Sequence, residues 1–161
     1  MNITTNEKLN HIVEKTRDIF KKDEYIKPIT FLFDKDNNGT ILPGFDFSND
    51  ISKDMFSFVI KKICNEKQIV ELFLVVESWV KEFIEYEDFK DKGKRVSEYD
   101  DKKEVIMILH ETKLSSDLYF IPILRSDNNV KLGELEKMKG ITGEGRFCGF
   151  LYSKDLDKTI H

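Results

Sequence analysis

Alanine is absent from this sequence, and arginine, histidine, cysteine and proline are scarce. The arginines are Arg17, Arg95, Arg125 and Arg146, whereas lysine, asparagine, isoleucine and phenylalanine are abundant. Alanine codons and most arginine codons are rich in G and C, while the codons of the abundant residues are rich in A and T. This bias predicts an AT-rich genome, most simply that of a low-GC bacterium or its phage.

The shortage of cysteine and histidine excludes a disulfide framework and a metal site rich in ligands. The chain has only 2 Cys and 3 His in 161 residues. Cys64 and Cys148 lie in apolar stretches, so we expect buried thiols in a reducing cytoplasm, and a single pair does not establish a disulfide. A zinc site made from these two and His110 would lack the close-spaced ligand pairs that zinc uses. We therefore expect no metal and no cofactor.

Long hydrophobic runs are also missing. No run approaches the roughly 18 uncharged residues of a membrane-spanning helix, which excludes a transmembrane segment from this sequence. Residues 1–8 are polar and lack the apolar core of a signal peptide, so we expect a cytoplasmic protein without membrane contacts. Hydrophobic residues still make up 40%, with 13 Phe, which is enough for a core and excludes wholesale disorder.

An excess of positive charge is absent as well. Lys and Arg total 26 against 30 Asp and Glu, and the net charge is −4. The basic groups at residues 21–22, 61–62 and 92–95 are each diluted by nearby acids. Because nucleic-acid binding needs a basic face, we expect no nucleic-acid partner and interpret these groups as solvated surface.

Two amphipathic helices are predicted. The capping box Thr4-x-x-Glu7 begins a helix over residues 5–22, whose apolar positions recur at helical spacing. Asp50 or Ser52 caps a second helix that ends near Asn65. Its predicted apolar stripe consists of Met55, Phe56, Val59, Ile60 and Ile63.

The remaining apolar runs predict strands. Residues 29–33 and 40–42 form a hairpin around the turn 34–39. Residues 69–76 are almost continuously apolar and predict a central strand with both faces covered. A second hairpin joins residues 104–111 to 118–124. Weaker patterns predict a short strand or turn at 130–135 and a final strand at 146–152.

These elements predict one α+β domain over residues 1–161. The expected order is α-β-β-α-β-β-β-β, with two helices covering one or both faces of a mainly antiparallel sheet of about five to six strands. Residues 85–103 are dense in charge and predict a long exposed loop, while residues 153–161 predict a loose tail.

The turn at residues 34–39 resembles the first part of a calcium-binding EF-hand loop. Asp34, Asp36, Asn38 and Gly39 occupy the ligand and glycine positions that such a loop needs. The twelfth position, however, holds Phe45 where a bidentate glutamate is required. We therefore expect an ordinary hairpin turn and no calcium site.

A glutamate and a histidine are the only hint of catalysis. His110 lies within a predicted strand, and Glu77 would approach it if the two strands pair. Such a pair suits proton transfer, which keeps a small hydrolase-like enzyme using Glu77 and His110 as the alternative function. A polar pair at a sheet end or in solvent is the simpler interpretation, and we favour a protein that is not an enzyme.

The segments Val-Val-Glu-Ser-Trp-Val at residues 75–80 and Val-Ser-Glu-Tyr-Asp-Asp-Lys-Lys-Glu at 96–104 suggest a relationship. They resemble an uncharacterised group of small bacterial and phage α/β proteins, a domain of unknown function. In that group a strand ends in Glu-Ala-Trp, and a Pro-Ser-Glu-x-Pro-Asp-Arg-x-Glu loop leads into the next strand. Here Ser78 replaces alanine, Val96 and Tyr99 replace the prolines, and Lys102 replaces arginine. The resemblance implies an outline of the fold and no activity.

Trp79 and the charged loop form the predicted binding surface. Trp79 is expected to pack beneath the loop, with Glu77 or Glu98 holding backbone amides or Lys102, and we favour this structural role. In the functional version, the aromatic and acidic side chains of the region contact a partner. The binding residues expected on this basis are Trp79, Tyr86, Phe89, Glu98 and Tyr99.

The sequence as a whole predicts a cytoplasmic binding or accessory protein that acts through a protein partner. Its size, acidic balance, long charged loop and lack of a catalytic motif favour this function. The sequence identifies neither the partner nor the oligomeric state.

Overall fold

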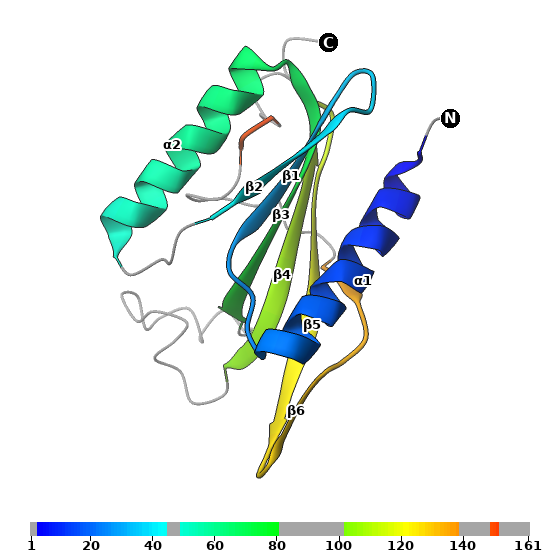
Figure 1. Ribbon diagram of the computed structural model, residues 1–161, viewed down its shortest axis with the longest axis vertical. Helices are drawn as coiled ribbons and strands as arrows, with labels where there is room; N and C mark the ends of the chain where they lie inside the picture. Colours follow the sequence, from blue (N-terminus) through cyan, green and yellow to red (C-terminus); the bar gives the residue numbers. More distant parts are fainter. Residues whose placement is uncertain (1–2, 45–48, 81–101, 139–148, 152–161) are drawn as a thin grey trace, which may run out of the picture.

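The computed structural model describes residues 3–44, 49–80, 102–138 and 149–151. Within these residues it contains two helices and a seven-stranded antiparallel sheet, which confirms a single α+β domain (Figure 1). The elements are α1 (Thr5–Asp23), β1 (Ile29–Asp34), β2 (Gly39–Pro43), α2 (Asp50–Glu66), β3 (Ile69–Val80), β4 (Lys103–Thr112), β5 (Ser116–Ser126), β6 (Asn129–Leu132) and β7 (Glu136–Met138).

The sheet has the strand order β2-β1-β3-β4-β5-β6, and β7 pairs with β5. The central position predicted for residues 69–76 is confirmed, because β3 lies between β1 and β4. It runs to Val80, beyond the predicted end, since β4 continues to pair with it as far as Lys103. No helix in the described part of the chain is long and apolar enough to cross a membrane.

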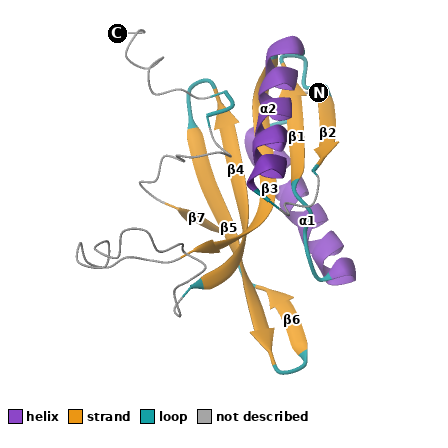
Figure 2. Cartoon of the chain, turned by 90° about the vertical axis from the view of Figure 1, so that its left-hand side faces the viewer, coloured by secondary structure: helices purple, strands orange, loops and turns teal. Residues whose placement is uncertain are grey.

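The two helices cover opposite faces of the sheet (Figures 1 and 2). Alternate strand residues point to opposite faces, so each helix has its own apolar cluster. The α1 cluster contains Leu9, Ile12, Val13, Phe20, Phe31, Phe73, Val75, Ile106, Ile108, Ile121 and Ile123. The α2 cluster contains Leu32, Phe56, Ile60, Cys64, Leu72, Leu74, Val76, Leu109 and Leu118.

Local chemistry fixes where the helices begin. The capping box at α1 forms as predicted, with Thr4 accepting from the Glu7 amide and Glu7 accepting from the Thr4 amide. The predicted cap of α2 at Asp50 or Ser52 is wrong. Asn49 caps the helix instead, because its side-chain oxygen accepts the Ser52 amide hydrogen at 2.8 Å.

The cap of α2 is expected to stabilise the fold measurably. Asn49→Ala removes the acceptor for the Ser52 amide and should lower the free energy of unfolding by about 1 kcal/mol. Asn49→Asp keeps an acceptor and should change it much less. Urea unfolding followed by circular dichroism measures both variants, and equal losses in the two would contradict the capping role.

The hairpin turn at residues 34–39 is confirmed by the antiparallel pairing of β1 with β2. One Asp34 carboxylate oxygen accepts the amide hydrogens of Asp36 and Asn38, each at 2.9 Å. These bonds lower the pKa of Asp34. The Asp34 carboxylate therefore stabilises the turn by accepting hydrogen bonds from within it. The expectation that the turn binds no calcium stays a prediction.

The C-terminal part of the prediction needs correction. The sheet has seven strands instead of five to six: β6 (Asn129–Leu132) overlaps the short strand or turn predicted at 130–135, and β7 (Glu136–Met138) was not predicted. Gly149, Phe150 and Leu151, placed in a final strand by the sequence, belong to no strand, and the chain bends at Phe150 and Leu151. Lys103 belongs to β4 and not to the charged loop. The rest of that loop and the tail at 153–161 lie outside the described residues.

Candidate functional site

A buried carboxylate, Glu71 on β3, is the centre of a polar cluster on the α1 face of the sheet. Its Oε1 lies 2.7 Å from Lys8 Nζ, and both side chains are almost fully buried. Its Oε2 accepts the Thr5 hydroxyl hydrogen at 2.7 Å and lies 2.8 Å from His110 Nε2. The cluster therefore ties α1 to β3 and β4 through one side chain.

Neighbouring residues hold the partners of Glu71 in place. Lys8 Nζ also donates to Asn37 Oδ1 of the β1–β2 turn at 2.8 Å and lies 4.4 Å from the centre of the Phe33 ring. The His110 ring lies 4.6 Å from the Phe73 ring, and its Nδ1 is 3.8 Å from Asp117 Oδ2 on β5. Lys8 and His110 thus each have several contacts, as buried polar groups require.

The surroundings of Glu71 favour its ionised form. Burial by itself raises the pKa of this carboxyl group. The hydrogen bonds from His110, Lys8 and Thr5, together with the charge of Lys8, outweigh burial and lower the pKa of Glu71 to about 2. Glu71 is therefore an anion throughout the physiological pH range.

The stability contributed by Glu71 should disappear in acid. Its folded-state pKa of about 2 lies below the value of about 4.3 for an unfolded glutamate. The unfolded state therefore binds more protons, so the contribution, on the order of 3 kcal/mol, is complete above about pH 5 and is lost as the pH falls towards 2. Urea midpoints of the wild type and Glu71→Gln between pH 2 and 7 should converge in acid. Parallel profiles would contradict this assignment.

The predicted approach of Glu77 to His110 is wrong, although their strands do pair. The register places Phe73 opposite His110 and Glu77 opposite Ile106. The two side chains are thus four residues apart along the strands, or about 13 Å. Glu77 Oε1 instead accepts the Ile26 amide hydrogen at 2.7 Å and holds the connection between α1 and β1.

Sequence reasoning missed Glu71 as the partner of His110. The available signal was the single carboxylate in the otherwise apolar run of residues 69–76. Because strand residues two apart share a face, Glu71 and Phe73 point to the side that His110 also occupies. A buried acid on that face requires a cation, and Lys8 lies 63 residues away in the sequence.

Trp79 lies near the end of β3 and is 40% exposed. The Lys102 ammonium is 4.9 Å from the centre of its ring, a cation–π contact that covers one face of the indole. This contact places Lys102 against Trp79, and the expected contact of Lys102 with Glu77 or Glu98 stays a prediction. The other predicted binding residues, Tyr86, Phe89, Glu98 and Tyr99, lie outside the described residues.

A second buried carboxylate, Glu111 on β4, faces α2. Its two oxygens accept the amide hydrogens of Gly149, Phe150 and Leu151 at 2.8, 2.9 and 3.0 Å. These bonds hold residues 149–151 where Phe150 packs in the α2 cluster. They explain why this segment bends instead of joining the sheet. The sequence placed Glu111 on the face opposite His110 but did not identify this role.

Cys64 is a buried free thiol, as predicted, and Cys148 lies outside the described residues. Burial and then the charge of Glu111 raise the pKa of Cys64 to about 11, so the thiol is not a nucleophile at neutral pH. Cys64 belongs to the α2 side of the sheet and His110 to the α1 side. The described residues contain no group of three or more potential metal ligands.

The outer face of α2 carries an exposed apolar stripe. Ile51, Met55 and Phe58 are 72%, 59% and 67% exposed and follow the i, i+4, i+7 spacing of one helix face. The prediction that Met55 belongs to the same stripe as Phe56 and Ile60 is wrong, because Phe56 and Ile60 point into the α2 cluster and Met55 points outward. Asp54 and Lys61 border the same edge of the exposed stripe, and Lys62 follows the stripe on the same face, towards the C-terminal end of α2.

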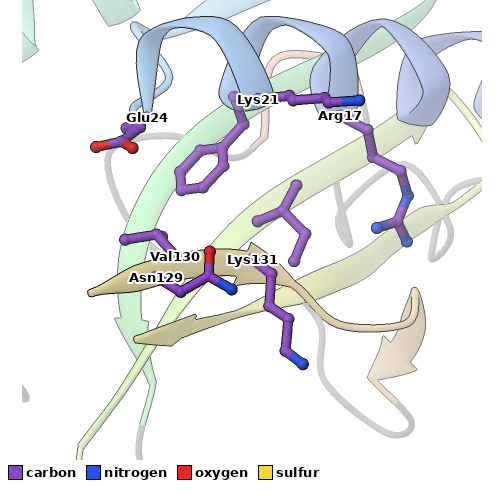
Figure 3. Close-up of a pocket in the computed structure, with 8 residues that line it drawn as sticks. Arg17, Lys21, Glu24, Asn129, Val130 and Lys131 are labelled. Atoms are coloured by element: carbon purple, nitrogen blue, oxygen red, sulfur yellow. The ribbon is translucent and has the colours of Figure 1, made fainter. Parts of the chain in front are cut away.

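A pocket of about 460 Å³ lies between the C-terminal half of α1 and β6 (Figure 3). Phe20 of α1, with Val130 and Leu132 of β6, supplies its apolar lining, and all three pack on the α1 cluster. Arg17 closes one end by donating from Nη2 to the Gly133 carbonyl oxygen at 2.9 Å. Glu24 lies at the opposite end.

No family model, curated protein or solved structure matches the chain. The resemblance at residues 75–80 and 96–104 therefore stays a prediction.

Proposed function

We propose that this chain is a protein-binding module and that the outer face of α2 docks against a helix of a partner protein. The exposure of Ile51, Met55 and Phe58 on one helix face is the observation that supports this function. Contiguous apolar surface with a polar border is typical of interaction sites. Aromatic and methionine side chains are also enriched at interfaces.

The buried ionisable groups support binding over catalysis. Glu71 accepts from Lys8, Thr5 and His110, and Glu111 accepts from three backbone amides. Such bonds use the acceptor positions that a general base needs for a substrate proton. The alternative hydrolase-like function required Glu77 beside His110, and the register of β3 and β4 separates them.

The stripe also indicates what kind of partner it fits. Its residues at i, i+4 and i+7 suit an amphipathic helix laid along α2. Asp54 lies beside the stripe, and Lys61 and Lys62 lie towards its C-terminal end. The partner helix should therefore present apolar side chains to the stripe and an acidic residue near Lys61.

Affinity capture with matched variants tests this proposal. Tagged wild type incubated with lysate of a low-GC bacterial host should retain a defined protein, and Phe58→Glu or Met55→Glu should lose at least about 90% of it, because a charge would be buried in the interface. Leu114→Glu is the control, since Leu114 is 76% exposed and lies outside the stripe. All three variants should keep the wild-type urea midpoint.

Analytical ultracentrifugation of the purified chain, which measures its oligomeric state, is the second test. If wild type dimerises and Phe58→Glu is monomeric, the partner helix is α2 of a second copy, and the proposal of a different protein is overturned. Capture that survives both Met55→Glu and Phe58→Glu would remove the outer face of α2 from consideration.

A further inference from the structure

We infer that the pocket between α1 and β6 binds a small organic anion, with its acidic group at Arg17 and Lys21 and a flat apolar body over Phe20, Val130 and Leu132. This site is on the opposite side of the sheet from α2 and is independent of protein docking (Figure 1). Its volume of about 460 Å³ lies within the range of small-molecule sites.

The apolar lining selects the body of the ligand. Phe20 lines the pocket and is almost fully buried, and Val130 and Leu132 are partly buried against the α1 cluster. These side chains come from a helix and a strand, so they are positioned by regular structure. A planar ring system filling the pocket would cover apolar surface that water now contacts.

The charged end selects an anion. Arg17 and Lys21 are four residues apart on α1 and therefore neighbours, and Figure 3 shows Lys21 extending along the helix towards Arg17. The bond from Arg17 to the Gly133 carbonyl fixes the guanidinium, whose remaining N–H groups are directed donors for a carboxylate or sulfonate. Within the described residues, no acidic side chain forms an ion pair with Arg17 or Lys21.

The opposite end sets the orientation of the ligand. Glu24 would repel an acidic group there, so the anion is directed to the Arg17 end. Lys131 lines the pocket through its strand position, but Figure 3 shows its side chain turned away from α1. Lys131 is therefore a matched cation that should not contribute to binding.

Fluorescence titration with two dyes tests the inference. The probes are anilinonaphthalene sulfonate, an aromatic anion, and phenylnaphthylamine, its uncharged counterpart, measured on Phe58→Ser protein so that the α2 stripe does not compete. The sulfonate should bind at one site and weaken about tenfold in Arg17→Met, as expected for loss of a charge-assisted hydrogen bond. Lys21→Met should weaken it several-fold, and Lys131→Met should not.

The uncharged dye distinguishes loss of the Arg17 charge from damage to the fold in the Arg17→Met protein. Its affinity should change less than about twofold in Arg17→Met, whereas Val130→Trp, which fills the pocket, should abolish binding of both dyes. Equal weakening of the two dyes in Arg17→Met would assign Arg17 a purely structural role and overturn the anion site. Sulfonate binding that persists in Val130→Trp would overturn the pocket.

Discussion

Replacing Glu71 with alanine is expected to lower the free energy of unfolding by about 3–5 kcal/mol, because it leaves the buried Lys8 and His110 without their carboxylate. The loss has little to do with the net strength of the ion pair. It reflects the cost of keeping a cation out of water with no anion beside it. Urea unfolding near pH 7, followed by circular dichroism, measures the change.

A double-mutant cycle with Lys8 identifies the origin of the loss. Lys8→Met removes the buried ammonium while keeping much of its apolar volume, so the Lys8→Met/Glu71→Ala protein should be about as stable as Glu71→Ala alone, or more stable. Losses that simply add would show that Lys8 and Glu71 act independently. A loss below about 1 kcal/mol for Glu71→Ala would mean that water reaches the cluster.

The central position of β3 in the sheet could be predicted from the sequence, but the polar cluster around Glu71 could not. Near-continuous apolar residues over 69–76 require burial on both faces, and this property is local. The partners of Glu71 lie on α1 and β4, and they meet it only after the sheet register and the helix position are fixed. The alternation of side chains along a strand places Glu71 and Phe73 on one face of the sheet. It does not identify the cation that pairs with Glu71.

The same limit applies to α2. Helical spacing predicted the helix, but apolar residues occur on more than one of its faces, and Met55 and Phe56 are adjacent. Which face is buried depends on the sheet beneath, where Phe56 and Ile60 meet Leu72 and Leu74. The exposed stripe of Ile51, Met55 and Phe58 therefore consists of the apolar residues of α2 that the core leaves uncovered. Its exposure is a tertiary property, which helical spacing alone does not predict.

The second large effect is expected at Glu111, which is fully buried and accepts three backbone amides. Glu111→Ala leaves those N–H groups without their acceptor, at a cost of about 1–3 kcal/mol each if they stay buried. Residues 149–151 can instead release into water, which exposes Phe150 and limits the total. We therefore expect a loss of about 3 kcal/mol in unfolding free energy, with contributions from the lost bonds and from Phe150.

Hydrogen exchange distinguishes release of this segment from general loosening of the fold. In Glu111→Ala, the amides of Gly149, Phe150 and Leu151 should lose their protection, while those of β3 should be less protected only by the global loss. Glu111→Gln keeps one carbonyl oxygen and should retain part of the protection, since Oε1 alone accepts from Phe150 and Leu151. Unchanged protection in the alanine variant would show that the three amides are held by something other than the Glu111 carboxylate.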